Sequence, residues 1–438
     1  MRTRHLAAIG LTAALLAAGC GGADPAADPA PAAGAESAPG AAAESVTPVD
    51  GCADPDAARE KITGTLKVGW SAALSGPLAQ AVGAVIDGMK ARFEVANAAG
   101  GVGGVKLEVV AKDDAFNPEK AKANVNELIQ KDGVHVLDTF GSGQLNAVAD
   151  DQNEACVPLL FGQASVPAYR DAKNFPWTTE YLPSAEVEMA VVVEQLKKKY
   201  PGGATVALAV NQTESGQGYA QGFKKAIEGT NLKIIKEAPL TDPNAAATTL
   251  KASGAQVLVD AGVTTDCLTL SMAVGRAGWK PDTFVQPANC VDGKSLYEPA
   301  GEAADGQQIM VWLKDPGNPI YAEDEAVKKY LADMEAQGNK APLNNYTVNG
   351  WAIADLMVDV FTTASSSPDG LSRLGIMNAA RTQEYHPPMF IDGIDWKMSP
   401  TQALGIMAFR PFVWSAEKKT FEPAGDVVDI SHNYAQGD

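Results

Sequence analysis

The sequence predicts an α/β protein made of two Rossmann-like, doubly wound lobes. From residue 64 onward, short apolar or β-branched runs alternate with longer segments of helical periodicity, and the same alternation starts again after residue 184. Alternation of this kind builds a parallel sheet covered by helices, and its recurrence indicates two such sheets. The chain has 438 residues, which is enough for two or three domains of roughly 150 residues each.

The composition is that of a folded, soluble body. Hydrophobic residues make up 46% and charged residues 20%, and 53 acidic residues outnumber 35 basic ones, for a net charge of -18. A nucleic-acid backbone would be repelled by this charge. We therefore expect no nucleic-acid partner.

Residues 1–19 are predicted to be a lipoprotein signal peptide. Arg2 and Arg4 precede an apolar run over 6–18, and the stretch Leu-Ala-Ala-Gly-Cys ends at Cys20. The run is too short for a permanent span, which needs about 20 apolar residues, and no later stretch is longer. Its ending resembles a bacterial lipobox, in which cleavage leaves a lipid-modified Cys20; the alternative is an ordinary secretory signal with a chance cysteine. We expect lipid anchoring at Cys20 on the outer face of the cytoplasmic membrane.

A tether is predicted to follow the anchor, over residues 20–60. As far as Asp50 the segment is almost entirely Ala, Pro, Gly, Glu, Asp and Ser, with no basic or aromatic residue. Such a composition cannot bury a core and favours a disordered linker.

The globular part is then expected to contain the following elements in order. The first lobe begins with strands over 66–70, 106–110, 134–137 and 157–161 and helices over 78–99, 118–131 and 144–155. The second carries helices over 184–199, 217–228, 243–252 and 266–277 and strands over 205–210, 233–236, 256–260 and 283–286. Helices over 321–337 and 346–365 follow, and short strands are expected near 406–409 and 427–430.

Four cysteines remain besides Cys20: Cys52, Cys156, Cys267 and Cys290. An even number in an exported chain suggests two disulfides, for which three pairings exist. Cys267 and Cys290 each follow an apolar segment and would lie at the same end of adjacent strands. This favours Cys267 with Cys290, and Cys52 with Cys156.

Signatures of catalysis are weak. The glycine pattern over 216–222 has its third glycine one residue late for a dinucleotide fingerprint, and the stretch 288–295 resembles a phosphate loop but has Ala288 in place of the first glycine. No Gly-x-Ser-x-Gly elbow occurs, and the four histidines are scattered. We expect no enzyme activity, no metal and no cofactor.

Small polar residues follow several predicted strands. Ser75 follows the first strand, Ser142 lies between two glycines after the third, and Gln163 and Ser165 come after the fourth. The carboxyl ends of parallel strands form the ligand crevice of such folds, and hydroxyl groups beside free N–H groups at a helix start suit a carboxylate. The alternative is that Ser142 and Ser165 only cap helices.

Three segments carry a resemblance to a known family. The stretches 66–77 (LKVGWSAALSGP), 105–114 (VKLEVVAKDD) and 157–161 (VPLLF) resemble the leucine/isoleucine/valine-binding family of ABC-transporter solute-binding proteins, which have the type I periplasmic-binding fold. The likeness extends from about Gly64 to Asp429. It implies two lobes joined by three crossovers, near 178–181, 289–292 and 391–395, which close on a ligand. Lobe 1 would comprise 61–180 plus 291–393, and lobe 2 would comprise 181–290 plus 394–438.

The resemblance also implies a ligand site. Ser142 and Ser165 match the hydroxyl positions that hold an α-carboxylate, and Asp266 matches the acidic position that receives the α-ammonium. Ser75, Gln163 and Ser215 complete the expected set of ligand-binding residues. The sequence departs from the family where Ser215 and Ala81 stand in place of aromatic residues and Gln163 in place of a small one, which indicates a pocket of different shape.

The function implied is transport. The resemblance favours an extracytoplasmic solute-binding lipoprotein that delivers a branched-chain amino acid, or a related small amphipathic carboxylate, to ABC permease subunits. The alternative is a sensing receptor of the same fold for amides, urea-like or aromatic compounds.

Overall fold

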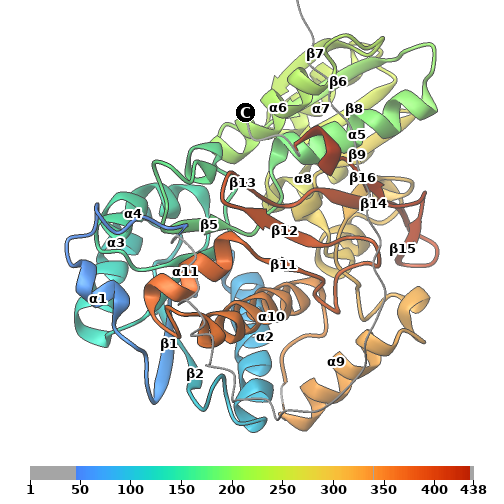
Figure 1. Ribbon diagram of the computed structural model, residues 1–438. Coiled ribbons are helices and arrows are strands. Elements are labelled where there is room, and N and C mark those ends of the chain that lie inside the picture. The colour runs from blue at the N-terminus through green and yellow to red at the C-terminus, as the bar shows by residue number, and fades with distance from the viewer. Residues whose placement is uncertain (1–45, 339, 435–438) are drawn as a thin grey trace, which may run out of the picture. The chain divides into compact units, whose positions relative to one another are not determined.

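The computed structural model describes residues 46–338 and 340–434 (Figure 1). The predicted signal peptide 1–19, Cys20 and the first part of the predicted tether, 20–45, lie outside this range. None of the helices within it is long and apolar enough to cross a membrane.

The first sheet has five strands, all parallel, in the order β2-β1-β3-β4-β5. Its strands are β1 (Thr65–Ala72), β2 (Lys106–Asp113), β3 (Val136–Thr139), β4 (Leu159–Gly162) and β5 (Thr178–Glu180). Its helices are α2 (Ala79–Ala98), α3 (Pro118–Glu127) with a π-helical extension (Leu128–Asp132), α4 (Ser142–Glu154), α10 (Asn345–Ser366) and α11 (Arg373–Arg381). The connections from β1 to β2, from β2 to β3 and from β3 to β4 each pass through an α-helix, as the alternating pattern predicts, whereas β4 and β5 are joined through a 3₁₀ turn, Pro167–Arg170.

The second sheet has eight strands. Its main path is β15-β14-β10-β9-β8-β6-β7, and β16 pairs with β14. The strands are β6 (Thr205–Val210), β7 (Lys233–Pro239), β8 (Val257–Ala261), β9 (Thr283–Gln286), β10 (Gln308–Val311), β14 (Ala408–Ser415), β15 (Thr420–Pro423) and β16 (Val428–Asp429). The helices are α5 (Ala185–Lys199), α6 (Glu214–Ala226), α7 (Pro243–Lys251) and α8 (Thr264–Arg276). Strands β6 to β10 are parallel, whereas β14 to β16 add antiparallel pairs.

A small antiparallel sheet and several short elements complete the chain. The third sheet contains β11 (Glu384–Tyr385), β12 (Trp396–Ser399) and β13 (Gln402–Ile406). The two remaining α-helices are α1 (Pro55–Arg59) and α9 (Glu325–Ala336). Short 3₁₀ or π turns cover Pro167–Arg170, Ala288–Cys290, Gly293–Tyr297, Glu298–Ala304, Pro319–Tyr321 and Ser431–Asn433.

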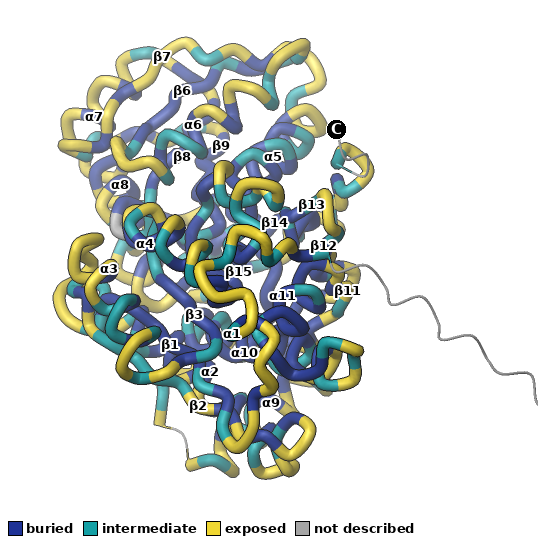
Figure 2. The backbone as a smooth tube through the Cα atoms, turned by 60° about the vertical axis from the view of Figure 1, so that its left-hand side comes forward, coloured by how far each residue is buried: buried dark blue, intermediate teal, exposed yellow. Residues whose placement is uncertain are grey.

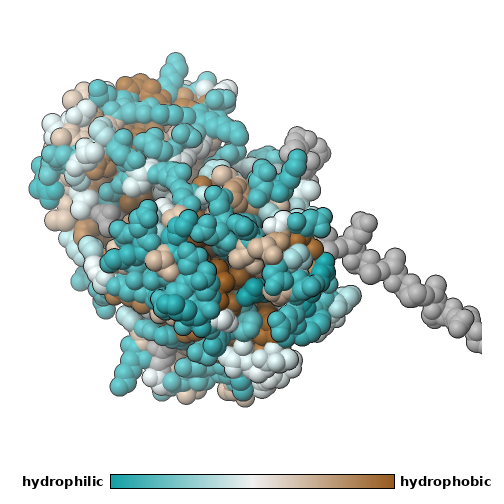
Figure 3. Space-filling model, turned by 90° about the vertical axis from the view of Figure 1, so that its left-hand side faces the viewer, coloured by the Kyte–Doolittle hydropathy of each residue, from teal (hydrophilic) through white to brown (hydrophobic). Residues whose placement is uncertain are grey.

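The central strands of both large sheets are buried, and Figure 2 shows buried residues in dark blue, whereas the outer strands β2 and β7 are largely exposed or half-buried. All five residues of β8 are buried, because helices cover both faces of a parallel sheet. Hydrophilic residues predominate on the surface shown in Figure 3, as expected from the excess of acidic side chains.

The second crossover differs from the expectation. The chain does not return to the first lobe near 289–292, because β10 pairs with β9 and β14 in the second sheet. It leaves after Val311, where Leu313 bridges Phe390 and the Ile391 N–H donates to the Trp312 carbonyl at 2.9 Å. Residues 291–311 therefore pack with the second sheet. The apolar run that contains β10 covers five residues, 309–313, and periodicity alone does not distinguish so short a strand from a buried helical segment.

The expected assignment of residues 394–438 to lobe 2 is also corrected in part. Residues 396–406 were expected in lobe 2, but they form β12 and β13 of the small sheet. The Trp396 ring stacks on Tyr181 at 6.0 Å and meets Phe161 edge-on at 5.2 Å. These aromatic contacts place the small sheet against the first crossover.

The predicted tether is wrong over residues 46–60. The Ala53 N–H donates to the Glu154 carbonyl at 2.8 Å, and the Trp177 ring N–H donates to the Pro48 carbonyl at 3.2 Å. Helix α1 follows, capped by Asp54. The cause is covalent: the Cys52–Cys156 disulfide, with Cα atoms 5.4 Å apart, attaches this polar segment to the end of α4.

The expected disulfide pairing is confirmed at both bonds. Besides Cys52–Cys156, the second bond joins Cys267 to Cys290, with Cα atoms 6.0 Å apart. It connects the first turn of α8 with the turn after β9. It therefore fixes two neighbouring strand-end loops of the second sheet.

Candidate ligand-binding site

In the first lobe, the loops after β3 and β4 are joined by backbone hydrogen bonds. The Gln163 N–H donates to the Thr139 carbonyl at 2.9 Å, and the Gly141 N–H donates to the Gln163 carbonyl at 3.0 Å. Gly141 has a φ of 105°, which favours glycine, and it directs the chain into α4. The two loops therefore bring Ser142 and Gln163 together, as the strand-end argument predicts.

Ser142 is the first residue of α4 and is half-buried. The N–H groups of a first helical turn have no partner within the helix, and the helix dipole is positive at this end. Gly141, the residue before it, makes no side-chain cap. This corner of the first lobe is therefore suited to an anionic group.

Gln163, which is among the ligand-binding residues expected from the sequence and is also a departure from the family pattern, adds a donor. Its side chain is 2% exposed, and its Oε1 accepts from the Asn349 amide at 3.2 Å. Its Nε2 has no partner within the described structure. A buried amide donor without a partner is costly, and a bound acceptor would remove the cost.

Ser165 and Ser75 are both occupied by structural hydrogen bonds. The Ser165 hydroxyl donates to the Pro183 carbonyl and accepts from the Ala185 N–H, both at 3.2 Å, so it caps the start of α5. Ser75 is exposed, and its hydroxyl bond to Asp113 is the largest cause that holds the pKa of that carboxyl below its usual range. The capping alternative thus describes the contacts of Ser165.

In the second lobe, Asp266 joins the loops after β6 and β8. It is 8% exposed, and its Oδ2 accepts from the Asn211 amide at 2.7 Å and from the Val263 N–H at 2.9 Å. The second bond caps the start of α8. Ser215 lies four residues after Asn211 and is half-buried in the first turn of α6.

A second carboxyl group, Asp260, lies beneath Asp266. It is fully buried, and neither of its oxygens has a hydrogen-bond partner among the described residues. Burial, and then the charge of Asp266, raise the pKa of Asp260 well above its usual range. The sulfur atoms of Cys267 and Cys290 lie within 4.8 Å of it, but the disulfide uses both sulfurs, so this cluster offers no thiolate to a metal.

Contacts around the first turn of α10 connect the two sets of loops. Asn349 binds Gln163 of the first lobe, and the Asn345 amide donates to the Val291 carbonyl at 3.3 Å. Two residues away, the Asn289 carbonyl accepts from the Thr264 hydroxyl at 3.3 Å, at the start of α8. A further bond runs from the Asn146 amide to the Glu214 carboxylate. The strand-end loops of both sheets therefore belong to one contact network.

Sequence reasoning missed two aromatic residues beside Ser142. Phe116 is 48% exposed, has a φ of 59°, and lies over Gly141, where an added Cβ would stand 2.8 Å from its ring. Its ring centroid is 6.2 Å from that of half-buried Phe140. The available signal was an apolar side chain in a polar turn, Asp-Asp-Ala-Phe-Asn-Pro, directly after a strand. The pair provides an apolar wall next to the anion-binding corner.

The arrangement suits binding more than catalysis. One side offers donors, the other an acidic acceptor, and an aromatic pair lies beside the donors. A ligand with a carboxylate, an ammonium group and an apolar body would satisfy all three.

Comparison with known proteins shows the family to which the chain is similar. Residues 65–414 match the model of the family described as periplasmic binding protein. The chain is 24% identical over 338 residues to the leucine-, isoleucine-, valine-, threonine-, and alanine-binding protein of Pseudomonas aeruginosa, an alignment that covers 76% of this chain and 86% of that protein.

Solved structures show the same fold. A branched chain amino acid ABC transporter from Thermus thermophilus with bound valine superposes with a TM-score of 0.72 at 17% identity, covering 83% of this chain and 96% of that one. A solute binding protein from R. palustris in complex with 4-hydroxybenzoate gives a TM-score of 0.69 at 20% identity, covering 83% and 97%. These likenesses confirm the predicted fold class. Because the family match covers well over half of the chain and includes the strand-end loops described above, the chain belongs to the periplasmic binding protein family.

Proposed function

We propose that this protein is the solute-binding component of an ABC importer and that it captures a branched-chain amino acid or a related small amphipathic carboxylate between its two lobes. The observation that carries the proposal is the pairing of a donor-rich corner at Ser142 and Gln163 with the acidic Asp266 on the other lobe. The names of the relatives support it, since they are binding proteins for amino acids and not enzymes. Transfer to permease subunits follows from the same likeness.

The proposed ligand lies with its carboxylate at the start of α4. The first-turn N–H groups, the Ser142 hydroxyl and the unpaired Gln163 Nε2 donate to it. Ser165 adds a donor if its hydroxyl hydrogen turns away from the Pro183 carbonyl, which it meets at a long 3.2 Å. The exposed Ser75 and the half-buried Ser215 complete the proposed set of ligand-binding residues.

The rest of the ligand faces the second lobe and the aromatic pair. Asp266 receives the ammonium group, and Phe116 with Phe140 covers the side chain. This pair compensates for the small residues Ala81 and Ser215 that stand where the family pattern has aromatic ones. Both ends of the ligand are satisfied only when the lobes meet, so binding favours closure.

A thermal-shift screen followed by calorimetry tests the proposal. Ligand at 100 times its Kd adds about 2.7 kcal/mol to the free energy of unfolding, so leucine, isoleucine or valine should raise Tm clearly. Gln163→Met removes the unpaired donor and should weaken carboxylate binding by about tenfold. Gln130→Met, at an exposed glutamine, is the matched control and should bind like the parent. The proposal fails if no amphipathic carboxylate raises Tm, or if Gln163→Met and Gln130→Met bind alike.

Aromatic carboxylates are the second candidate class, with a sensing role as the alternative to transport. The exposed Phe116 ring next to Ser142 favours this class, and the R. palustris neighbour was solved with 4-hydroxybenzoate. An aromatic acid has no ammonium group, so removing the charge of Asp266 would leave its affinity unchanged. The same screen, extended to benzoates and amides, decides between the classes.

Anchoring through Cys20 is part of the proposal and is supported by the lipobox-like ending of the leader. Replacing the cysteine removes the acceptor of the lipid, so Cys20→Ser should move the protein from the membrane fraction to the soluble fraction. Cys52→Ser is the control, because it removes a cysteine without touching the leader. Retention of Cys20→Ser in the membrane fraction at the level of the parent would contradict the anchor.

A further inference from the structure

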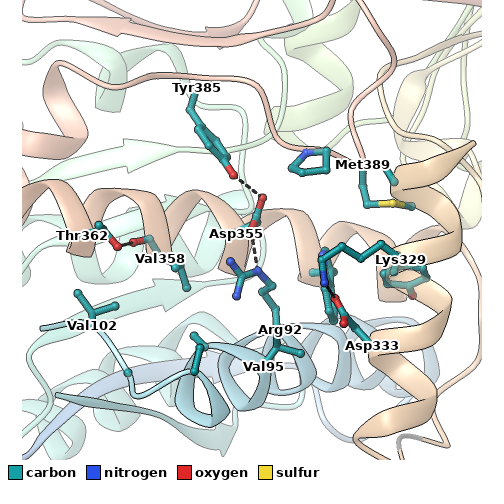
Figure 4. Close-up of a pocket in the computed structure, with 17 residues that line it drawn as sticks. Arg92, Val95, Val102, Lys329, Asp333, Asp355, Val358, Thr362, Tyr385 and Met389 are labelled. Atoms are coloured by element: carbon teal, nitrogen blue, oxygen red, sulfur yellow. Dashed lines mark hydrogen bonds and ion pairs between the residues drawn. The ribbon is translucent and has the colours of Figure 1, made fainter. Parts of the chain in front are cut away.

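A cavity of about 390 Å³ lies between α2, α9 and α10, apart from the strand-end loops (Figure 4). Its wall is mostly apolar, with Val95, Val102, Val358 and Met389 among the lining residues. Its size falls in the range of roughly 300–1,000 Å³ that is typical of small-molecule sites. None of Ser142, Gln163 and Asp266 lines it.

The sequence explains why space remains here. Helices α2 and α10 touch backbone to backbone at Gly88 and Gly350, where no Cβ could fit. Beyond this contact, the small residues Ala96 of α2 and Ala99, which directly follows α2, line the cavity. With α9 forming a third wall, these side chains are too small to fill the volume between the helices.

Arg92 points from α2 into this space, and its side chain is bonded to Asp355 through Nε alone. Its Nε donates to Asp355 at 2.6 Å, and the other oxygen of Asp355 accepts from the Tyr385 hydroxyl at 2.9 Å (Figure 4). For the two Nη groups of Arg92, the described structure shows no protein acceptor. The guanidinium lies 6.0 Å from the Trp351 ring centroid. The guanidinium of Arg92 is therefore held in place through Nε, and its Nη groups can donate to a ligand in the cavity.

Tyr330 provides an independent sign of a ligand. It lines the cavity from α9, its side chain is 1% exposed, and its hydroxyl has no hydrogen-bond partner within the described chain. Burial raises the pKa of Tyr330, so the hydroxyl is a neutral donor. Its ring meets Trp351 edge-on at 5.1 Å, which fixes its position. A buried hydroxyl without a partner is costly unless a ligand or water accepts from it.

We propose that this cavity is a second binding site, for a small apolar monocarboxylate such as a branched aliphatic or aromatic acid. The carboxylate accepts from the Arg92 Nη groups and the Tyr330 hydroxyl, and the hydrocarbon part lies against the valine and methionine side chains. The two carboxylates that line the cavity already have partners, so neither is available to a ligand's ammonium group. Asp355 binds Arg92 and Tyr385. Asp333 forms an ion pair with Lys329 at 2.6 Å. The site therefore excludes amino acids and accepts their deaminated relatives.

Occupancy is expected to be independent of the strand-end site. The walls come from α2, α9 and α10 and from residues 99–102 and 385–389, none of which carries Ser142, Gln163 or Asp266, and the charge of Arg92 is already balanced by Asp355. Binding is accordingly driven largely by apolar burial and should be weak, with a strong preference for a carboxylate over the matching alcohol or amide.

The test uses 3-methylbutanoate and benzoate as probes. Saturation-transfer NMR on the full mature protein measures their binding. Ala326→Trp fills the cavity from its half-buried rim and should weaken probe binding at least tenfold. Ala336→Trp, at an exposed position on the same helix, is the matched control and should bind like the parent. Tyr330→Phe removes only the hydroxyl and should weaken binding severalfold with little change in circular dichroism.

Gln163→Met separates the two sites. Probe binding that survives Gln163→Met and is lost in Ala326→Trp supports the second site. The inference is overturned if Ala326→Trp binds like Ala336→Trp, if Gln163→Met alone abolishes the signal, or if neither acid binds the parent at millimolar concentration.

Discussion

The side-chain amide of Asn211 donates a 2.7 Å hydrogen bond to the carboxylate of Asp266, and this bond joins the loops that follow β6 and β8. The same carboxylate caps α8 through the Val263 N–H. Asp266 therefore holds the second lobe's half of the proposed site in shape, in addition to its proposed contact with a ligand.

This double role gives the first prediction. Asp266→Asn keeps an acceptor for the cap but removes the charge, so it should weaken binding of an α-amino acid by at least about tenfold with a small change in Tm. Asp266→Ala should also lower the unliganded stability by about 1 kcal/mol, because the cap is lost. Calorimetry and thermal denaturation measure the two effects. Equal affinity of Asp266→Asn and the parent for the best amino-acid ligand would show that no ammonium group binds here.

The second prediction concerns the contact between α2 and α10. A Cβ at position 350 would overlap the Val85 carbonyl, so Gly350→Ala should force the helices apart and destabilise the protein by about 3 kcal/mol or more. Gly83→Ala in α2 is the control, since nothing lies within 4 Å of its added Cβ, and it should stabilise by up to about 1 kcal/mol through helix propensity. Urea unfolding gives both values. If the two variants have equal stability, the close helix contact is not as described.

The third prediction concerns the segment 46–60. The Cys52–Cys156 bond closes a loop with a sequence separation of 104 residues, for which the chain-entropy model gives about 4–5 kcal/mol. The double variant Cys52→Ser/Cys156→Ser should lower Tm and make 46–60 the first site of limited proteolysis. A variant that keeps both the parent Tm and the parent cleavage pattern would contradict a stabilising role for this disulfide.

The fourth prediction concerns pH. Glu188 is fully buried in α5, and its Oε1 accepts from the Ala288 N–H at 2.7 Å. Burial raises the pKa of Glu188 from its ordinary 4.5 to about 8, so the native state favours the protonated form. Its contribution to stability is fully present below about pH 4.5 and is lost as the pH rises to about 8.

Glu188→Gln keeps the acceptor and cannot ionise. The parent should therefore lose stability relative to this variant as the pH is raised from about 5 to 8, and the difference should level off above that range. Thermal denaturation of both proteins across this interval measures it. A constant difference in Tm over the interval would show that Glu188 does not titrate there.

The candidate site divides into parts that local sequence indicates and parts that it does not. Ser142 is indicated by the pattern of polar residues that follow strands and by the family likeness, whereas Asp266 is indicated by the family likeness alone. The unpaired Nε2 of Gln163 is invisible to such a pattern, since it depends on Asn349, which is 186 residues away in the chain. The capping role of Ser165 likewise depends on how the chain enters α5.

By itself, the sequence determined the α/β class and the two-lobe organisation, and it favoured the observed pairing of the cysteines over the two other possible pairings. These follow from short-range periodicity and from strand ends, which are properties of neighbouring residues. Tertiary structure alone decided the rest. It placed β10 in the second sheet, ordered residues 46–60 through a disulfide, and left a cavity beside Arg92. Each of these depends on contacts between segments far apart in the chain, where packing volume and covalent closure outweigh local preference.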